Sequence, residues 1–306
     1  MKKVLYIQAL HPSGMELLKK KYDVIVADSE NKEYIKSIIG DFNAVVTRLT
    51  RIDKDIIESG KKLEAIAKHG VGTDNIDVDF AKAKGIEIIT TGDANSNSVA
   101  EHTVFALGAL SKRIPYLDAS VRKGHWAARD ETGSVDFSEK TVGIVGLGRI
   151  GERVAKIVKN GFNAKVYVYD PFMTKEAIEK KEYLYVDTVE QLCEISDYIT
   201  IHTPLTEETR NLIDYKKLQL MKPTAYLANF ARGGIVNEKD LFRALKEKVI
   251  AGAAIDAFEK EPPETESELM MLDNVLLSPH CGTFSEDSKK RMSLAVAYGI
   301  DKALSK

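Results

Sequence analysis

The sequence is poor in the features that mark secreted, membrane-spanning and nucleic-acid-binding proteins. Only two of its 306 residues are cysteines, and Cys193 and Cys281 stand far apart, so a disulfide framework is excluded and a reducing cytoplasm is expected. The longest apolar run, residues 104–110, is far shorter than the roughly 18 residues of a membrane span. Lys2 and Lys3 lead directly into a strand-like run without a small-residue cleavage site, which argues against a signal peptide. A formal net charge of -2 provides no global positive field for nucleic acid or an anionic membrane surface.

What the sequence does contain indicates a two-domain α/β protein. A chain of this length exceeds what one hydrophobic core usually fills, and 44% hydrophobic with 29% charged residues is a globular composition. Short β-rich runs alternate with amphipathic stretches over residues 4–90 and again over residues 141–277, which predicts parallel sheets with helices on their faces. Between the two series, residues 91–97 are polar and turn-rich, and residues 98–112 have the pattern of a helix that is apolar nearly all round. We therefore predict two Rossmann-like, doubly wound domains.

The most specific single motif is a glycine-rich turn between a predicted strand and a predicted helix. Residues 141–145 run into Gly146, Gly148 and Gly151, which have the spacing G-x-G-x-x-G. The first glycine permits a tight turn, the second lets the backbone approach a pyrophosphate, and the third lets helix and strand pack closely. Asp170 ends the next predicted strand about 20 residues further on, where a carboxylate accepts hydrogen bonds from the adenosine ribose and repels the 2′-phosphate of NADP. The motif predicts an NAD site, although Asp170 also fits the start of an Asp-Pro turn.

Three polar residues follow later predicted strands, at the sheet edge where open α/β folds place their chemistry: Arg232, Glu261 and His280. Hydride transfer to a ketone leaves an alkoxide, so a proton-donating imidazole and a fixed guanidinium near the oxygen both lower the barrier. A carboxylate at Glu261 would favour the protonated form of His280, and the planar fork of Arg232 can bind carboxylate and carbonyl oxygens together. Taken singly, each residue also has an ordinary structural explanation, as a surface anchor, a solvated acid or a strand-end histidine.

Together, these motifs resemble the D-isomer-specific 2-hydroxyacid dehydrogenase family, in particular its phosphoglycerate dehydrogenase branch. The matching segments extend over nearly the whole chain and are residues 70–75, 97–102, 146–151, 202–206, 229–234, 256–262 and 278–282. The resemblance implies an NAD-dependent oxidoreductase acting on the CH–OH group of a D-2-hydroxy acid. Because the sequence ends at Lys306, we expect it to lack the C-terminal regulatory domain that many members of that branch carry.

The family also implies a role for each matching residue. His280 matches the acid/base, Glu261 the partner of that histidine, and Arg232 the group that binds the substrate's carbonyl and carboxylate oxygens. The backbone of Val71 and Gly72 matches the segment that receives the substrate carboxylate. The residues that the resemblance assigns to NAD are Gly146, Gly148, Arg149, Ile150, Gly151, Asp170, His202, Thr203, Pro204, Phe230, Ala231, Arg232, Asp256, His280 and Gly282, with Asp256 at the nicotinamide carboxamide.

The domain organisation follows from the same resemblance. It implies a flavodoxin-like substrate domain made of residues 1–97 and completed by a C-terminal helix at residues 283–306, with an NAD-binding Rossmann domain inserted as residues 98–282. The active site would lie between them. We also predict a homodimer, because the helix at residues 98–112 has little polar face for a monomer and matches a two-fold interface in the family.

The physiological substrate is the least constrained part of the prediction. Arg48 and Lys68 match positions that hold a substrate phosphate in the phosphoglycerate dehydrogenase branch, and Arg129 would add a charge from a neighbouring subunit. We therefore predict D-3-phosphoglycerate, with hydroxypyruvate or glyoxylate reduction as the alternative; both cations also fit solvent-facing strand ends. A different alternative is an NAD-sensing corepressor-like protein without turnover. We predict no metal site, because the spacing of His69, Asp74 and Asp77 matches no metal motif.

Overall fold

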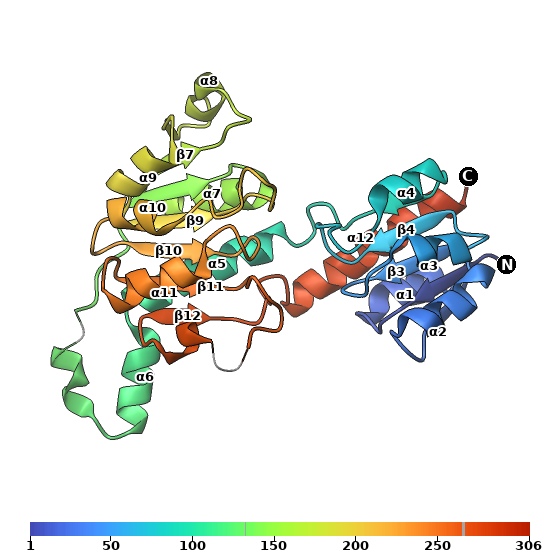
Figure 1. Cartoon of the computed structure of the whole chain (residues 1–306), viewed down its shortest axis with the longest axis horizontal. Helices are drawn as coiled ribbons and strands as arrows, with labels where there is room; N and C mark the ends of the chain where they lie inside the picture. The colour runs from blue at the N-terminus through green and yellow to red at the C-terminus, as the bar shows by residue number, and fades with distance from the viewer. Residues whose placement is uncertain (132, 265–266) are drawn as a thin grey trace. The chain divides into compact units, whose positions relative to one another are not determined.

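The computed structural model describes residues 1–131, 133–264 and 267–306, and it divides the chain into two compact units (Figure 1). Unit 1 consists of Met1–Asn95 together with Thr283–Lys306, and unit 2 consists of Ser96–Gly282. Each unit has its own parallel sheet and its own hydrophobic clusters. Among the described residues, no helix has both the length and the apolar character needed to cross a bilayer.

Unit 1 contains a five-stranded sheet in the order β2-β1-β3-β4-β5, in which every neighbouring pair is parallel. This is the flavodoxin-like order. The strands are β1 (Lys3–Tyr6), β2 (Asp23–Val26), β3 (Ala44–Thr47), β4 (Ala65–Lys68) and β5 (Glu87–Ile89). The helices are α1 (Pro12–Leu18), α2 (Lys32–Ile38), η1 (Ile39–Asp41), α3 (Lys54–Ser59), α4 (Val78–Ala83) and α12 (Glu286–Leu304).

Both faces of this sheet are covered, which explains why its central strands are apolar at almost every position. Val4 and Tyr6 pack in one cluster with residues of α1 and α12, while the alternate residues Leu5 and Ile7 pack in another with residues of α2, α3 and α4. Figure 1 shows the C-terminal helix α12, in red, beside the blue N-terminal strands of the same unit. The C-terminal segment thus completes the core of unit 1.

Unit 2 contains a seven-stranded sheet in the order β12-β11-β10-β9-β6-β7-β8, again with every neighbouring pair parallel. The strands are β6 (Thr141–Val145), β7 (Lys165–Tyr169), β8 (Leu184–Tyr185), β9 (Tyr198–Ile201), β10 (Tyr226–Asn229), β11 (Gly252–Ile255) and β12 (Val275–Leu277). The helices are α5 (Ser96–Ser111), α6 (Ile114–Arg122), η2 (Trp126–Asp130), α7 (Arg149–Phe162), α8 (Lys175–Glu179), α9 (Val189–Ile195), α10 (Tyr215–Leu220), α11 (Glu238–Lys246) and η3 (Glu268–Met271). The prediction of two doubly wound parallel-sheet units is confirmed.

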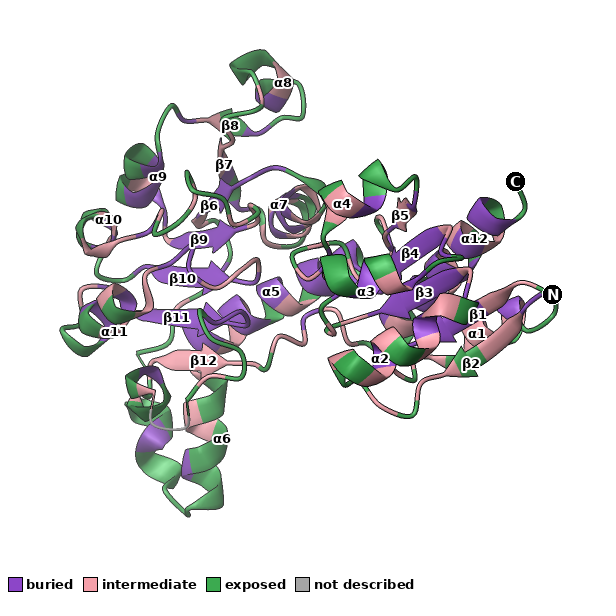
Figure 2. Cartoon of the chain, turned by 45° about the vertical axis from the view of Figure 1, so that its right-hand side comes forward, coloured by how far each residue is buried: buried purple, intermediate pink, exposed green. Residues whose placement is uncertain are grey.

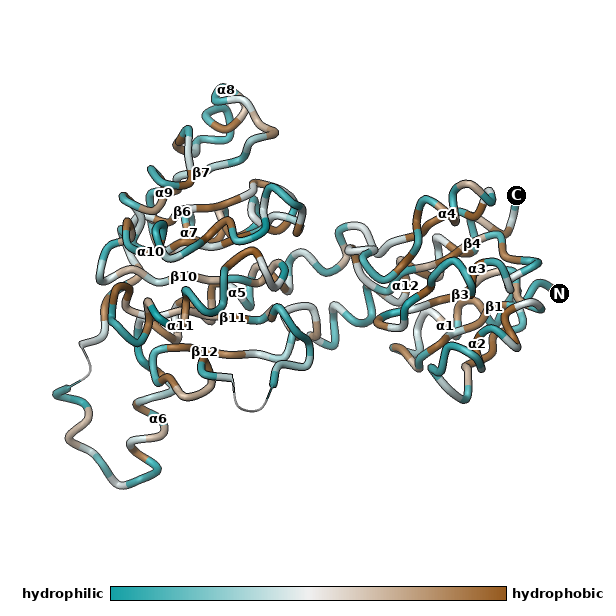
Figure 3. The backbone as a smooth tube through the Cα atoms, viewed as in Figure 1, coloured by the Kyte–Doolittle hydropathy of each residue, from teal (hydrophilic) through white to brown (hydrophobic). Residues whose placement is uncertain are grey.

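Helices of unit 2 cover the two faces in separate groups. α5, α7 and α8 share one cluster, and α9, α10 and α11 share the other. Figure 2 shows the central strands β9, β10 and β11 as buried, and Figure 3 shows the hydrophobic residues concentrated along the strands. The switch in strand order falls at β6, between β9 and β7, which is where open α/β sheets form a ligand crevice.

The long apolar helix predicted at residues 98–112 is α5, and its burial has an explanation within unit 2. Val99, Val104, Leu107 and Leu110 all belong to the core cluster that includes residues of β6 and α7. A helix enclosed by its own unit needs no polar face there, so its composition does not by itself indicate a partner subunit. Phe105 is a large apolar residue of α5 that does not share this burial, since 72% of its surface is exposed.

Candidate active site

The glycine-rich turn joins β6 to α7, and each of its three glycines meets a different demand. At Gly146, where φ is +89°, a Cβ would lie 2.8 Å from Thr203 Cγ2, and at Gly151 a Cβ would lie 2.1 Å from the Gly146 carbonyl oxygen. At Gly148, by contrast, no atom lies within 4 Å of a Cβ position, so this side of the turn is open. Two glycines therefore allow close packing, and the third leaves room for a ligand.

The start of α7 has the properties of an anion site. Gly148 is its N-cap and supplies no side-chain hydrogen bond to the first N–H groups of the helix. Other helices of the chain do have side-chain caps, namely Asn31, Asp53, Asp77, Thr174, Thr188, Asp214, Asn237 and Ser285. The uncapped N-terminus of a 14-residue helix beside an open glycine fits the pyrophosphate of a dinucleotide. Arg149 and Ile150 form the first turn of this helix.

Asp170 directly follows β7 and lies against the glycine-rich turn. One carboxylate oxygen accepts a hydrogen bond from the Leu147 N–H at 2.8 Å, and the other accepts from the Phe172 N–H at 2.9 Å. The residue therefore does begin the Asp-Pro turn, as one interpretation of the sequence held, and it also braces the dinucleotide turn. A carboxylate accepts about four hydrogen bonds, so two more donors, such as ribose hydroxyls, can still be accommodated.

The segment after β9 lies against the glycine-rich turn, on another side of the expected cofactor site. His202 continues the strand ladder by donating its N–H to the Val145 carbonyl at 2.8 Å, and its Nε2 contacts Thr200 Oγ1 at 2.9 Å. Burial of the ring lowers the pKa of His202 to about 3, so the imidazole is neutral and unsuited to act as a general acid. Among the described residues, His202 Nδ1 and Thr203 Oγ1 are buried without a hydrogen-bond partner, which fits polar groups that face a cofactor. Pro204 follows them.

His280 and Glu261 form a direct pair, as the sequence predicted. His280 Nδ1 lies 2.9 and 2.8 Å from the two oxygens of the Glu261 carboxylate, and about 40% of each side chain is exposed. Glu261 also accepts the Phe258 N–H at 3.1 Å. Burial alone would raise the pKa of Glu261, but the hydrogen bonds from His280 and Phe258 and the charges of His280 and Arg232 outweigh it and hold that pKa below its usual value. Because Nδ1 is engaged by an ionised carboxylate, Nε2 is the nitrogen left for a substrate.

Arg232 is brought to this pair by a close contact between two loops. It follows β10, and its Nη1 donates to the Ala231 carbonyl at 2.8 Å, while its own carbonyl accepts from Asn229 Nδ2 at 2.8 Å. At the next residue, Gly233, a Cβ would lie 1.9 Å from the carbonyl oxygen of Phe258, so only glycine permits this approach. The loop that carries Arg232 therefore lies directly on the loop that leads to Glu261.

Asp256, expected at the nicotinamide carboxamide, anchors the loop that carries His280. It is 2% exposed, and its carboxylate accepts from Ser278 Oγ at 2.5 Å, from the Cys281 N–H at 2.9 Å and from the Gly282 N–H at 3.0 Å. Its carbonyl accepts the His280 N–H at 2.8 Å. This anchoring role was not predicted from the sequence, because no local motif links residue 256 to residues 278–282.

One group in unit 2 has the residue types of a metal site. His102, Asp256 and Cys281 have potential ligand atoms within 4.8 Å of one another. Burial and the neighbouring Asp256 carboxylate raise the pKa of the Cys281 thiol, whereas a metal requires the thiolate. His102 contacts the ring of Phe230 at 5.3 Å, so its position is also explained by packing against the expected cofactor wall. The Asp256 carboxylate accepts three hydrogen bonds from residues 278–282, so this group also has a structural role without a metal.

The residues predicted to contact the substrate lie in unit 1. Arg48 follows β3, and its guanidinium lies 4.1 Å from the ring centroid of Phe284; burial lowers its pKa from the usual value. Val71 and Gly72 follow β4, and among the described residues neither of their N–H groups donates a hydrogen bond. Two adjacent unused N–H groups fit a carboxylate. Lys68 also ends β4, and its ammonium already donates to the Arg48 carbonyl and to Asn75 Oδ1.

The third predicted cation, Arg129, lies in η2 of unit 2, where its Nε lies 3.4 Å from the carboxylate of Asp130. The structure does not bring His69, Asp74 and Asp77 together as a group of potential ligands among the described residues.

Comparison with known proteins identifies the family of this chain. Residues 104–282 match the model of the NAD binding domain of D-isomer specific 2-hydroxyacid dehydrogenases. The chain is 40% identical over 305 residues to the D-3-phosphoglycerate dehydrogenase of Methanocaldococcus jannaschii, covering 99% of this chain but 58% of that protein. It is 37% identical over 308 residues to the glyoxylate reductase of Pyrococcus furiosus, covering 97% of this chain and 91% of that protein. The chain thus spans little more than half the length of the phosphoglycerate dehydrogenases it matches.

A solved structure of a D-2-hydroxy acid dehydrogenase is also similar to this chain. The D-lactate dehydrogenase of Aquifex aeolicus, complexed with NAD and lactic acid, superposes with a TM-score of 0.87 at 25% identity, covering 99% of this chain and 96% of that one. With a family model that matches more than half of the chain and a relative of similar length at 37% identity, this chain belongs to the family of D-isomer specific 2-hydroxyacid dehydrogenases.

Proposed function

We propose that the protein is an NAD-dependent oxidoreductase that interconverts a small D-2-hydroxy acid and its 2-oxo acid. The observation that carries the proposal is the His280–Glu261 pair beside Arg232. These three residues lie on loops that follow β10, β11 and β12. The same sheet contains β6, which leads into the glycine-rich turn. The carboxyl ends of parallel strands meet at one sheet edge, so a dinucleotide and these groups share that edge.

In this mechanism, bound NADH supplies the hydride for C2 of the 2-oxo acid. The residues of the chain control the proton and the charge. His280, held by Glu261 through Nδ1, donates a proton from Nε2 to the oxygen that becomes the hydroxyl. Arg232 stabilises the negative charge that develops on that oxygen and binds the adjacent carboxylate. In the oxidation direction His280 accepts the proton instead.

The division of the chain into two structural units supports a separate role for each. We propose unit 2 as the NAD-binding domain and unit 1 as the substrate domain, with the Val71 and Gly72 N–H groups receiving the substrate carboxylate. Two cysteines without a disulfide, one of them buried in the core, fit a reducing compartment, and we propose the cytoplasm.

The substrate is a small 2-oxo acid, and the relatives favour two types. Phosphoglycerate dehydrogenases and glyoxylate reductases match at similar identity. We propose D-3-phosphoglycerate, with hydroxypyruvate or glyoxylate as the alternative. Arg48, half-buried and stacked on Phe284, is the residue of unit 1 that we propose for a phosphate contact.

Turnover tests the proposal. Purified protein is mixed with NADH or NADPH and a panel of glyoxylate, hydroxypyruvate and 3-phosphohydroxypyruvate, and the loss of nicotinamide absorbance is followed. We expect turnover with NADH, and we expect His280→Asn to lower kcat by about 10²- to 10⁴-fold with little change in NADH affinity. Tight NADH binding without turnover of any of these acids would instead favour the NAD-sensing alternative.

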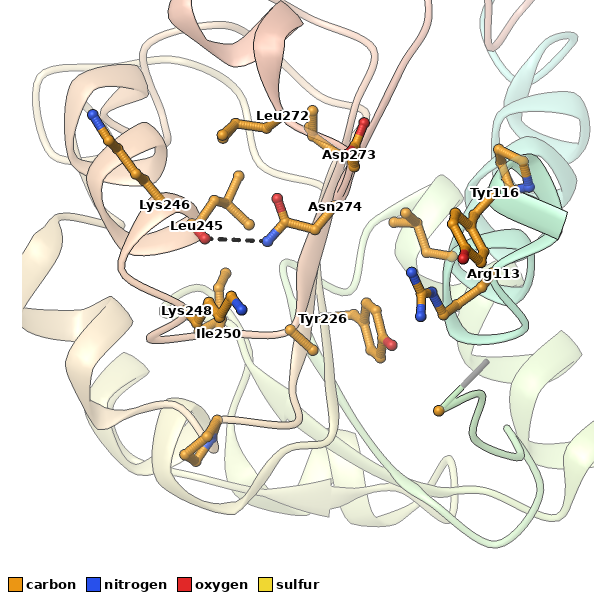
Figure 4. A pocket seen from close by; sticks show the side chains of 16 residues that line it. Arg113, Tyr116, Tyr226, Leu245, Lys246, Lys248, Ile250, Leu272, Asp273 and Asn274 are labelled. Carbon is orange, nitrogen blue, oxygen red and sulfur yellow. Dashed lines mark hydrogen bonds between the residues drawn. The ribbon is translucent and has the colours of Figure 1, made fainter. Parts of the chain in front are cut away.

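We also propose a homodimer, on different grounds from the composition of α5. Apolar side chains more than half exposed follow one another from α5 to η2: Phe105, Ile114, Val121 and Trp126. A pocket of about 620 Å³ is lined by residues next to Ile114 in the sequence and by the chain after α11; Figure 4 shows Arg113 and Tyr116 on one side of it and Leu245 and Leu272 on the other. An exposed apolar stretch next to a concavity fits a second copy of the chain. Light scattering should give twice 34.0 kDa; a constant monomer mass across dilution would contradict the proposal.

A further inference from the structure

Lys68 is the last residue of β4, and its hydrogen bonds link two loops of unit 1. Its ammonium donates to the carbonyl of Arg48, just after β3, and to Oδ1 of Asn75 at 2.6 Å. Asn75 in turn donates from Nδ2 to the Thr50 carbonyl at 2.8 Å, and its own carbonyl accepts the Ile52 N–H at 2.8 Å. Lys68 and Asn75 therefore clamp the loop after β3 to the loop after β4.

The same side chain lies along the backbone proposed to receive the substrate carboxylate. Gly70 has a φ of +157°, and a Cβ on it would lie 3.4 Å from Lys68 Cε, so the lysine stem packs against this glycine. Val71 and Gly72 follow directly, with their unused N–H groups. A shift of the Lys68 stem would displace this backbone as well as the carbonyl of Arg48.

We propose that Lys68 is a positioning residue, which fixes Arg48 and the Val71–Gly72 backbone for the substrate, rather than a ligand of a substrate phosphate. This inference rests on the proposed reduction of 2-oxo acids. Hydrogen bonds from an ammonium to neutral acceptors are stronger than those between neutral groups. To reach a phosphate, the ammonium would have to give up its bonds to Arg48 and Asn75 and leave two carbonyl oxygens with one donor fewer.

Two substitutions separate the hypotheses, because only one of them removes a charge. Lys68→Met removes the ammonium, and Asn75→Ala removes its acceptor while leaving every cation in place. If Lys68 acts through the loops, both variants raise KM by about tenfold or more, and by the same factor for glyoxylate and 3-phosphohydroxypyruvate, since the carboxylate subsite common to both acids is displaced. KM for NADH stays unchanged, because the dinucleotide turn belongs to unit 2. Lys61→Met, at an exposed lysine of unit 1, is the matched control and leaves both KM values unchanged.

Conservative variants keep the test decisive if a clamp variant unfolds. Lys68→Arg retains donors for both acceptors and should bring KM back to within a few-fold of the wild type. Asn75→Asp retains the acceptor for Lys68 and should have less effect on KM than Asn75→Ala. Melting temperatures identify any misfolded variant. A rise in KM for 3-phosphohydroxypyruvate alone in Lys68→Met, with Asn75→Ala silent, would overturn the proposal and make Lys68 a phosphate ligand. Wild-type protein is assayed first: if it reduces no 2-oxo acid, the proposed function fails, whereas unequal effects in an active enzyme defeat only the role of Lys68.

Discussion

Replacing Glu261 with glutamine removes one negative charge next to His280 with almost no change in shape. The charge lies 2.8 Å from His280 Nδ1, and the lowered pKa of Glu261 means that the carboxylate is ionised throughout the neutral range. In the reduction direction the active form of His280 is protonated, and the carboxylate stabilises that form. The variant should therefore reduce a 2-oxo acid more slowly than the wild type, because the charge that stabilises the proton-donating form is lost.

The exposure of the pair limits the size of this effect. About 40% of each side chain is accessible to water, so the pair is screened, and exposed ion pairs contribute about 0.2–1 kcal/mol. At about 1.36 kcal/mol for each factor of ten in rate, kcat/KM for reduction should fall by about 1.4- to 5-fold. The glutamine carbonyl can still accept the Nδ1–H of His280 and the Phe258 N–H, so the plateau rate should stay within about tenfold of the wild type.

The assay is steady-state NADH oxidation at neutral pH, with the glyoxylate concentration raised until the rate reaches its plateau. Glu261→Ala serves as the comparison, because it removes the acceptor as well as the charge and should lower the plateau further. If Glu261→Gln reduced glyoxylate as fast as the wild type, the electrostatic argument would be refuted. A plateau loss equal to that of Glu261→Ala would mean that the carboxylate is needed for positioning as well.

Three further predictions concern other parts of the site. NADH should be preferred over NADPH by at least about tenfold, or about 1.4 kcal/mol, because the Asp170 carboxylate would repel the 2′-phosphate of NADPH. Asp170→Ala should reduce that preference in the same assay. Gly233→Ala should lower both the melting temperature and kcat, because its Cβ would lie 1.9 Å from the Phe258 carbonyl oxygen. This contact would force apart the loops of Arg232 and Glu261, at a cost of about 1–3 kcal/mol. Normal unfolding and kinetics would show that the loops can separate freely. Arg48→Ala should raise KM more for 3-phosphohydroxypyruvate than for glyoxylate, and an equal rise for both would argue against a phosphate contact at this residue.

The parts of the site that the sequence predicted correctly are those with a local signature or a shared sheet edge. The glycine-rich turn is contiguous, so the strand, the turn and the helix are visible in one stretch of sequence. The pairing of His280 with Glu261 follows from the resemblance to the family and fits the rule that chemistry collects at the carboxyl ends of parallel strands. Neither inference required knowledge of packing.

The parts that could not be predicted depend on contacts between distant loops. The bonds from the Asp256 carboxylate to residues 278–282, the close approach of Gly233 to Phe258, and the two acceptors of Lys68 each join loops from different strands. A single sequence contains no pattern for such contacts, because each depends on how the loops lie after the sheet has formed. The apolar helix α5 was assigned correctly, but its place at a subunit interface stays a prediction, since an all-round apolar pattern does not distinguish burial in one subunit from burial between two.

The separate roles proposed for the two units have a consequence for substrate specificity. Arg232, Glu261 and His280 lie on loops tied together within unit 2, by the Gly233 contact and by the buried Asp256 carboxylate. The groups proposed to distinguish one 2-oxo acid from another lie in unit 1, after β3 and β4. Under the proposed mechanism, substitutions in those loops can therefore change the substrate without disturbing His280, the proposed proton donor, or Arg232, the proposed stabiliser of the alkoxide. On this proposal, relatives named D-3-phosphoglycerate dehydrogenase and glyoxylate reductase can match one chain at 40% and 37% identity because they share the proposed catalytic set and differ in the loops of unit 1.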